Sequence, residues 1–160
     1  MTFRIGQGFD VHALAPGETL WLGGVWIPHS KGTVAHSDGD VLIHAICDAL
    51  LGAAKLGDIG SNFPDTSGEY KNIDSKILLA RTCEMVRKKG YKIVNIDSTI
   101  CVQQPKLRPF IDEMEKTLAL IMSVDVNNIS VKATTTESLG FEGREEGVSA
   151  MAVALVNSSL

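Results

Sequence analysis

The sequence lacks an apolar stretch long enough to span a membrane, and it lacks a surplus of positive charge. Its longest apolar run, residues 41–56, is interrupted by His44, Asp48 and Lys55, whereas a membrane-spanning helix needs about 20 consecutive apolar residues. Lys and Arg number 15 and Asp and Glu 19, which gives a formal net charge of −4. A general nucleic-acid-binding protein usually carries a basic face. We therefore expect neither a membrane nor a nucleic acid as partner.

Cysteine is also scarce. The chain has three cysteines, Cys47, Cys83 and Cys101, with no CxxC pair among them, so the sequence indicates no disulfide framework. Residues 1–4 lead directly into a strand-like segment, and no signal peptide is recognisable. We expect a cytoplasmic protein whose cysteines are small buried apolar residues. Cys47, three residues after His44, could alternatively share a metal ion.

The remaining composition is that of one globular domain. The chain has 160 residues, of which 44% are hydrophobic and 21% charged, and without repeats or linker-like segments it is expected to form a single domain over residues 1–160. The patterns predict strands at 3–12, 91–104, 129–136 and 147–157, a hairpin at 20–28, helices at 41–54, 74–89 and about 109–122, and a loop at 61–73. This order predicts an α/β fold (an α+β sandwich) with a mixed β-sheet and helices on one face.

Two segments are more apolar than a small monomer requires. Residues 41–54 are apolar around the whole helix, which is typical of a helix buried on all sides. Residues 148–156 are apolar on both faces of a strand. A sheet covered by helices on one face needs cover on the other, so we expect that face to pack against other copies of the chain. A central strand in a monomer is the alternative.

A candidate metal site arises from one acidic residue and two histidines. Asp10 and His12 are two residues apart on a predicted strand, so both side chains point to the same side. His44 lies on the apolar helix, one turn from both Asp40 and Asp48, and a buried imidazole needs a metal or a hydrogen-bonding partner to organise it. Asp10, His12 and His44 could leave a fourth zinc position open, as catalytic zinc sites do. Hydrogen-bonded pairs without a metal remain the alternative.

Two other segments suit phosphate. The run KATTTE at residues 132–137 presents threonine hydroxyls at a strand end, and Glu137 could hold a magnesium ion between phosphates. Lys106 and Arg108 precede a predicted helix start, which favours an anion. The β-propensity of threonine and a solvated basic turn would explain the same residues without a ligand.

Two loop aspartates are candidate contacts for a polar substrate. Asp58 lies in a glycine-rich loop and Asp65 follows Phe63-Pro64. Loops of this kind often contact substrate hydroxyl groups. Both aspartates could equally be turn or capping residues.

Taken together, these motifs resemble the 2-C-methyl-D-erythritol 2,4-cyclodiphosphate synthase family of the non-mevalonate isoprenoid pathway. The resemblance covers nearly the whole chain. It is carried by GFDVH at 8–12, AHSDGD at 35–40, DALLGA at 48–53, GDIG at 57–60, FPD at 63–65, KATTTE at 132–137 and GFEGR at 140–144.

The resemblance implies a homotrimer with the sheets packed around its axis and with active sites between adjacent subunits. It implies a phosphorus–oxygen lyase that cyclises 4-diphosphocytidyl-2-C-methyl-D-erythritol 2-phosphate to the 2,4-cyclodiphosphate and releases CMP, so that CMP and CDP are expected ligands. A metal-dependent nucleotide phosphodiesterase and a non-catalytic trimer that binds cytidine nucleotides are the competing hypotheses.

The resemblance also implies metal ligands. Asp10, His12 and His44 match zinc ligands, and Glu137 matches a ligand of magnesium or manganese that substrate phosphates complete. This assigns two divalent ions to the phosphates, so that no protein nucleophile is needed.

The other matching residues are expected to contact substrate. His36 and Ser37 match residues beside the reacting phosphates. His36 and Thr135 are the expected catalytic residues, which would polarise or position the phosphates. Residues 58–60 and 63–65 match contacts to the methylerythritol end, and residues 102–108 and 134–135 match a cytidine diphosphate pocket formed largely by the neighbouring subunit. The complete expected set is Asp10, His12, His36, Ser37, Asp58, Ile59, Gly60, Phe63, Pro64, Asp65, Val102, Pro105, Lys106, Leu107, Arg108, Thr134, Thr135, Thr136, Glu137, Phe141 and Arg144.

Overall fold

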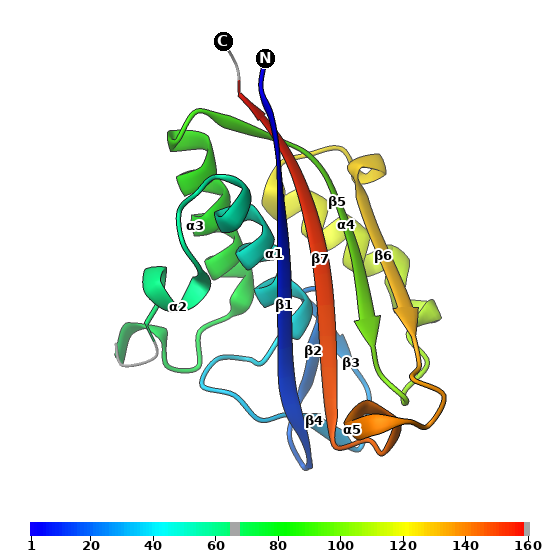
Figure 1. Ribbon diagram of the computed structural model, residues 1–160. Helices are drawn as coiled ribbons and strands as arrows, with labels where there is room; N and C mark the ends of the chain where they lie inside the picture. The colour runs from blue at the N-terminus through cyan, green and yellow to red at the C-terminus, as the bar shows by residue number, and fades with distance from the viewer. Residues whose placement is uncertain (65–67, 159–160) are drawn as a thin grey trace.

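A five-stranded mixed sheet with helices on one face forms the centre of the protein (Figure 1), as the sequence predicts. The computed structural model describes residues 1–64 and 68–158. The elements are β1 (Phe3–Pro16), β2 (Leu20–Leu22), β3 (Val25–Ile27), β4 (Lys31–Thr33), α1 (Val41–Ala53), α2 (Ile59–Asn62), the 3-10 turn η1 (Gly68–Tyr70), α3 (Ser75–Lys88), β5 (Tyr91–Cys101), α4 (Arg108–Met122), the 3-10 turn η2 (Val126–Asn128), β6 (Ile129–Thr134), α5 (Gly140–Gly143) and β7 (Gly147–Ser158). The sheet order is β4-β1-β7-β5-β6, and β2 and β3 form a separate hairpin. Only the β5–β6 pairing is parallel among the pairings in the described part of the chain.

The long predicted elements are confirmed, but five short ones, β4, α2, η1, η2 and α5, are not foreseen. The segment 61–73, expected to be a loop, overlaps the one-turn helix α2 and contains η1. Helix α2 is stabilised by a local capping box between Asp58 and Ser61. With four residues, the helix is too short to produce an apolar periodicity in the sequence. β4 and α5, with three and four residues, are likewise too short to produce a pattern in the sequence. The predicted strand 129–136 ends at Thr134, and the chain turns where Glu137 and Ser138 adopt φ of 54° and 62°.

Helix α1 is buried on nearly all sides, as its apolar sequence predicts. It packs against β1 so closely that only glycine fits beneath it. A Cβ added to Gly8 would lie 1.9 Å from the carbonyl oxygen of Ala45, and one added to Gly6 would lie 1.9 Å from that of Ala49. This approach of the two backbones brings the side chains of β1 next to those of α1.

We expect Gly8→Ala to lower the free energy of unfolding by about 3 kcal/mol, because overpacking forces the backbones apart. Gly52→Ala is the matched control on α1, since its added Cβ meets nothing within 4 Å and alanine favours a helix. Chemical denaturation of both variants measures the difference. Equal stability of the two variants would contradict the close approach.

The sheet has one covered face and one open face in the single chain. Strand β7 is central, and Ala150, Ala152 and Ala154 turn their side chains toward the helices and are buried. The opposite face of β1 and β7 exposes the large apolar side chains of Phe3, Ile5, Phe9, Val11, Met151 and Val153. A face of this composition is typical of a surface that packs against another protein chain.

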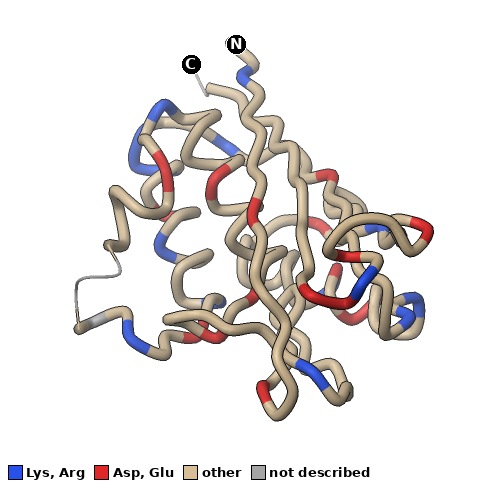
Figure 2. The backbone as a smooth tube through the Cα atoms, turned by 60° about the horizontal axis from the view of Figure 1, so that its bottom comes forward, with Lys and Arg blue, Asp and Glu red and all other residues tan. Residues whose placement is uncertain are grey.

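Charge is spread over the molecule. Figure 2 shows basic and acidic positions interspersed along the backbone trace. A phosphate ligand must therefore be held by local groups rather than by a general positive field. Among residues 1–64 and 68–158, no helix combines the length and apolar character needed to cross a bilayer.

Candidate active site

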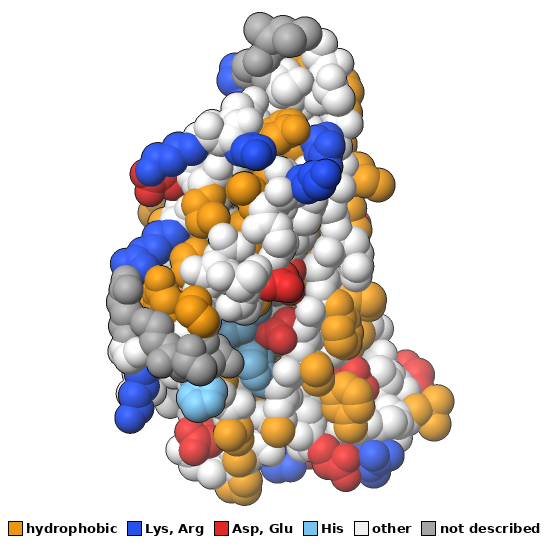
Figure 3. Space-filling view, turned by 60° about the vertical axis from the view of Figure 1, so that its left-hand side comes forward, with side chains coloured by type: hydrophobic (Ala, Val, Ile, Leu, Met, Phe, Trp, Pro, Cys, Tyr) orange, Lys and Arg blue, Asp and Glu red, His pale blue; other side chains and the backbone are white. Residues whose placement is uncertain are grey.

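Three side chains from β1 and α1 converge on one point. The carboxylate oxygen Asp10 Oδ2 lies 3.0 Å from His12 Nε2 and 3.0 Å from His44 Nδ1, and the two ring nitrogens are 3.2 Å apart. Figure 3 shows histidine and acidic side chains together on this face of the molecule. The prediction that Asp10 and His12 point to the same side of the strand is therefore correct. The packing of α1 on β1 brings His44 to the same point.

The donor set fits a zinc ion. Zinc prefers tetrahedral coordination by imidazole nitrogen and carboxylate oxygen at about 2.0–2.2 Å, which separates ligand atoms by about 3.3 Å. The three separations of 3.0–3.2 Å approach this value. Three protein donors also leave a fourth position for a ligand oxygen, as the sequence predicts. Cys47 is absent from this cluster, and burial raises the pKa of its thiol. This agrees with the expectation of a small buried apolar residue rather than with the alternative of a shared metal ion.

The electrostatics of the cluster favour a cation. Burial alone would raise the pKa of Asp10, but hydrogen bonds and charge from His12 and His44 outweigh burial and hold that pKa well below its usual value. Burial alone would lower the pKa of His44, but Asp10 in particular outweighs it, so the pKa of His44 is raised. The negative surroundings that favour a proton on the imidazole also favour a metal ion, which takes the place of that proton.

The acidic neighbours of His44 in sequence are not its partners. Asp40 is fully buried and accepts hydrogen bonds from the backbone N–H groups of Gly23, Gly24 and Ile43 at 2.7–3.0 Å. Burial raises the pKa of Asp40, and these N–H groups offset the rise in part. Asp48 instead accepts a 2.7 Å hydrogen bond from the backbone N–H of Ile59. The second ring nitrogen of His44, Nε2, instead contacts the hydroxyl groups of Ser37 and Ser75.

A cavity of about 350 Å³ surrounds the three ligands. Its lining residues are Asp10, His12, Val34, Ala35, His36, Ser37, His44, Ile59, Gly60, Phe63, Tyr70, Ile73 and Leu78. The structure thus brings five of the predicted substrate-contact residues, His36, Ser37, Ile59, Gly60 and Phe63, to the same cavity as the candidate metal ligands. Both polar and apolar residues line the cavity, which suits a small ligand that carries polar groups on a carbon skeleton.

The remaining residues of this loop have other roles in the chain or lie beside the cavity. Asp58 caps α2 by accepting hydrogen bonds from Ser61 N at 2.8 Å and Ser61 Oγ at 2.6 Å. These bonds lower the pKa of Asp58, so the capping alternative is correct for its side chain. Pro64 is exposed next to Phe63, and Asp65 lies outside the described residues.

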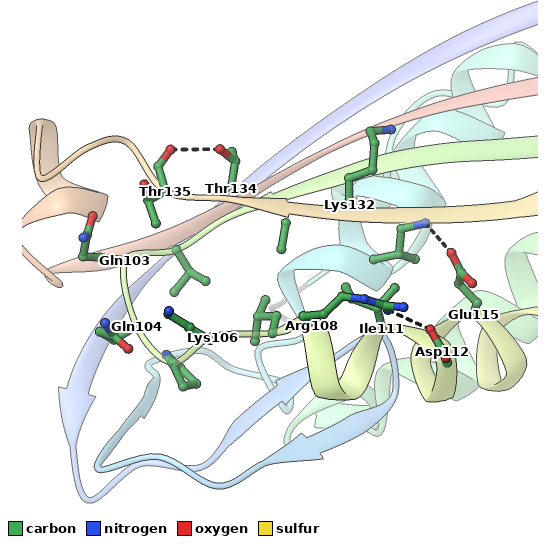
Figure 4. Close-up of a pocket in the computed structure, with 15 residues that line it drawn as sticks. Gln103, Gln104, Lys106, Arg108, Ile111, Asp112, Glu115, Lys132, Thr134 and Thr135 are labelled. Atoms are coloured by element: carbon green, nitrogen blue, oxygen red, sulfur yellow. Dashed lines mark hydrogen bonds and ion pairs between the residues drawn. The ribbon is translucent and has the colours of Figure 1, made fainter.

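A second cavity of about 740 Å³ lies between the first turn of α4, the segment before it and the end of β6. Figure 4 shows Lys106, Arg108, Thr134 and Thr135 around it. Its lining residues are Val102, Gln103, Gln104, Pro105, Lys106, Leu107, Arg108, Ile111, Asp112, Glu115, Val131, Lys132, Ala133, Thr134 and Thr135. The two segments predicted to form a nucleotide pocket, 102–108 and 134–135, therefore do come together.

The three basic side chains of this pocket differ in whether they form ion pairs within the chain. Arg108 Nη1 pairs with Asp112 Oδ1 at 2.8 Å, and Lys132 Nζ pairs with Asp97. Within the described ranges, Lys106 forms no ion pair and is exposed. Lys106 is therefore the cation most available to a phosphate.

Apart from Asp58 and Pro64, four described residues of the predicted set line neither cavity. Thr136, Glu137, Phe141 and Arg144 follow β6 in the turn and short helix that precede β7. Thr135 Oγ1 lies 3.3 Å from Glu137 Oε1, and Arg144 Nε donates to a carboxylate oxygen of Glu146 at 3.0 Å. In the described part of this chain, Glu137 is not part of a cluster of three metal-ligating side chains.

The sequence does not foresee two side-chain contacts in the site, one of Gln103 within the predicted segment 102–108 and one of Ser75. Gln103 lines the second cavity and accepts a 3.2 Å hydrogen bond from the backbone N–H of Ser138, which ties the two loops together. Ser75 contacts His44 across the fold. A serine at the start of a helix has no signal in the sequence that distinguishes it from a capping residue.

Comparison with known proteins shows similarity to one family and to relatives that share one name. The sequence profile of the YgbB family matches residues 3–157. Proteins named 2-C-methyl-D-erythritol 2,4-cyclodiphosphate synthase are 64% identical over 154 residues in Porphyromonas gingivalis, covering 96% of this chain and 95% of the relative, and 60% identical over 157 residues in Bacteroides fragilis, covering 98% and 99%.

Solved structures agree with this placement. An IspF of Plasmodium falciparum in complex with CDP superposes with a TM-score of 0.87 at 34% identity, over 99% of this chain and 97% of that one. The bifunctional IspDF of Campylobacter jejuni superposes with a TM-score of 0.95 at 44% identity, and this chain spans 43% of its length.

Proposed function

Because the chain belongs to the YgbB family, we propose that it catalyses the metal-dependent cyclisation of 4-diphosphocytidyl-2-C-methyl-D-erythritol 2-phosphate, with release of CMP. The observation that carries the proposal is the triangle of Asp10, His12 and His44 donor atoms, 3.0–3.2 Å apart, at the wall of a cavity. We further propose a cytoplasmic enzyme that is a single synthase domain over residues 1–160.

The reaction is an intramolecular phosphoryl transfer. An oxygen of the 2-phosphate attacks the β-phosphorus of the diphosphate and forms a new phosphorus–oxygen bond. The bond from that phosphorus to the bridging oxygen breaks, and CMP leaves with the electron pair. Nothing is oxidised or reduced, and no protein group need form a covalent intermediate. Positioning and charge neutralisation are therefore the main tasks of the protein.

Asp10, His12 and His44 would hold a zinc ion, and Glu137 would contribute one carboxylate to a magnesium or manganese ion. Divalent ions bound there would act as Lewis acids that neutralise and orient the phosphate oxygens. Glu137 supplies the only protein carboxylate that we propose for its ion, so substrate phosphates must complete that coordination.

The chain's own polar groups would act on the phosphates around these ions. His36 is exposed at the rim of the metal cavity, next to Ser37, where both can donate hydrogen bonds to a phosphate. Thr135 lines the second cavity, and its hydroxyl lies 3.3 Å from Glu137 Oε1. Lys106 supplies positive charge to the diphosphate as negative charge develops on the leaving CMP.

The two cavities suggest that one active site draws on two subunits. They share no lining residue, and they lie toward the β1 and β6 sides of the sheet, with β7 and β5 between these strands. We propose a homotrimer in which the open apolar face of the sheet surrounds the axis. The metal cavity of one subunit would then meet the nucleotide pocket of its neighbour, which Val102, Pro105, Leu107, Arg108 and Thr134 help to line.

The remaining residues would contact substrate from the loops. Asp58, Ile59, Gly60, Phe63, Pro64 and Asp65 would contact the methylerythritol end, and Thr136, Phe141 and Arg144 would lie on the phosphate side.

Turnover in water labelled with oxygen-18 tests the reaction. Incubation of the substrate with the protein, zinc and magnesium should yield equal amounts of the cyclic diphosphate and CMP, with no label in either product. Incorporation of the label would instead indicate a phosphodiesterase. Binding of CDP without any turnover would indicate a non-catalytic binding protein. Either result would overturn the proposal.

The hydrogen bond from Ile59 to Asp48 predicts a role in substrate binding. Removing the carboxylate in Asp48→Ala leaves the N–H of Ile59 without its partner and frees the turn at 58–60. We expect the KM for substrate to rise about tenfold, a loss of roughly 1.4 kcal/mol, at unchanged zinc content.

The matched control for this effect is Asp125→Ala. Asp125 also accepts a backbone N–H, from Asn127 at 2.8 Å, at the 3-10 turn η2. Steady-state kinetics of both variants measure the effect. If the KM of Asp48→Ala equals that of Asp125→Ala, the Asp48 contact does not position the substrate loop.

A further inference from the structure

We propose that Ser75 and Asp38 are positioning residues that keep the proton of His44 on Nε2 and so leave Nδ1 free for a metal ion. The inference rests on the proposed function in one respect, namely that Asp10, His12 and His44 hold zinc. It concerns residues that are neither metal ligands nor predicted substrate contacts.

The contacts form a chain from the ligand to a carboxylate. His44 turns Nδ1 toward Asp10 and His12 and turns Nε2 toward Ser75, whose Oγ lies 2.9 Å away. Ser75 Oγ in turn donates its proton to Asp38 Oδ1, and the backbone N–H of Ser75 donates to Asp38 Oδ2 at 2.8 Å. Ser75 is fully buried, so water does not compete for these bonds.

The direction of each bond follows from the number of protons. A carboxylate can only accept hydrogen bonds, and a serine hydroxyl has one proton to donate. Since that proton goes to Asp38, Ser75 Oγ must accept from His44 Nε2. The proton of a neutral His44 is thereby placed on Nε2, and the lone pair of Nδ1 points toward Asp10 and His12. This is the tautomer that a metal ion on Nδ1 requires.

Asp38 is itself held in place on several sides. Its backbone N–H donates to Ile73 O at 3.2 Å, and its Oδ1 accepts from the backbone N–H of Asp40 at 3.2 Å. Asp38 therefore joins the loop before α1 to the first turn of α3. Helix α3 contributes no metal ligand, yet its first residue determines the orientation of one.

Ser37 is a weaker second acceptor. Its Oγ lies 3.3 Å from His44 Nε2, farther than that of Ser75, and it already accepts the backbone N–H of Gly39 at 3.1 Å. Without Ser75, Ser37 would hold the ring less tightly. Loss of Ser75 should therefore weaken metal binding without abolishing it.

The test measures zinc affinity in three variants and one control by competition with a chromogenic chelator. Ser75→Ala removes the acceptor, and we expect zinc affinity to fall about 10–100-fold, the range found for other partners of metal-bound histidines. Asp38→Asn offers an amide that can donate a hydrogen bond to Ser75 Oγ. The serine proton could then point to His44 Nε2, which favours the tautomer with the proton on Nδ1. We expect at least as large a loss there. Ser75→Thr keeps the hydroxyl and should retain affinity within about threefold.

Ser98→Ala is the matched control. Ser98 is also buried, and its Oγ donates to the carbonyl oxygen of Ser130 at 3.0 Å, on β5 and away from the metal cavity. The control loses a buried serine hydroxyl in the same way, so it reports the effect of packing alone. Its zinc affinity should match that of the unaltered protein.

A second measurement needs no variant. Long-range proton–nitrogen NMR correlations of the zinc-loaded, unaltered protein should show the proton of His44 on Nε2. A proton on Nδ1 would overturn both the inference and the assignment of Nδ1 as the ligand atom. A Ser75→Ala variant that binds zinc as tightly as Ser98→Ala would overturn the inference while leaving the zinc site in place. Failure of the unaltered protein to bind zinc would overturn the zinc site and, with it, this inference.

Discussion

His44→Ala is expected to lower kcat/KM at least about 1000-fold, equivalent to about 4 kcal/mol of transition-state stabilisation, and to remove the zinc ion. The substitution takes away one of three donor atoms and leaves only Asp10 and His12. Catalytic zinc sites rely on three protein ligands. The phosphates would then meet without the cation that offsets their mutual repulsion. Metal analysis and steady-state turnover of the purified variant measure the two effects.

His29→Ala provides the matched control. His29 follows the β2–β3 hairpin and lies outside both cavities. We expect its zinc content and turnover to equal those of the unaltered protein. Full zinc occupancy in His44→Ala, or full activity without zinc, would refute the assignment of the site.

Mixed trimers are expected to regain activity from two inactive variants. His44→Ala disables the metal half of a site, and Lys106→Glu places a carboxylate in the nucleotide half, where it repels phosphate. If each site joins halves of adjacent subunits, random mixing in equal amounts restores about a quarter of the unaltered activity, because about a quarter of the sites combine two intact halves. The mixture is unfolded and refolded together, and turnover is measured per chain.

The control mixture combines His44→Ala with Asp10→Ala. Both substitutions disable the same half of the site, so no combination of subunits gives an intact site, and activity should stay at the level of each variant alone. Absence of recovery with Lys106→Glu would mean that each chain builds its own site. The open apolar face of the sheet would then require a different explanation.

Much of the fold is predictable because its long elements carry strong periodic patterns. The apolar residues around α1 predict burial on all sides, and the alternation along β1 places Asp10 and His12 on one side of the strand. Gly90, which follows α3, and Pro109, in the first turn of α4, mark those helices correctly. These signals are local, so they survive without any knowledge of tertiary contacts.

The tertiary partners in the site are not predictable from these patterns. That His44 faces Asp10 depends on Gly6 and Gly8, whose role as close-packing residues appears only when α1 lies on β1. The pairing of Asp48 with Ile59 and the chain from His44 to Asp38 are likewise properties of packing. Asp40 and Asp48 lie one turn from His44 in the sequence, but their carboxylates accept hydrogen bonds from backbone N–H groups instead.

The metal cavity and the nucleotide pocket show the same difference between local patterns, which the sequence carries, and long-range packing, which it does not. The parallel pairing of β5 with β6 brings the segments that follow them together, which places 102–108 beside Thr134 and Thr135. This pocket lies toward β6 and the metal cavity lies toward β1, at opposite ends of the strand order. That strand order is a long-range property of the fold. It depends on β7 inserting between β1 and β5.

A crystal structure of the zinc-loaded protein with CDP, recorded at the zinc absorption edge, would locate the metal ion and the nucleotide together. We expect one strong anomalous peak per chain, bonded to Asp10, His12 Nε2 and His44 Nδ1, with the phosphates of CDP reaching it from the 102–108 pocket of an adjacent subunit. A peak at other residues, or an empty triangle in crystals of fully active protein, would contradict this expectation.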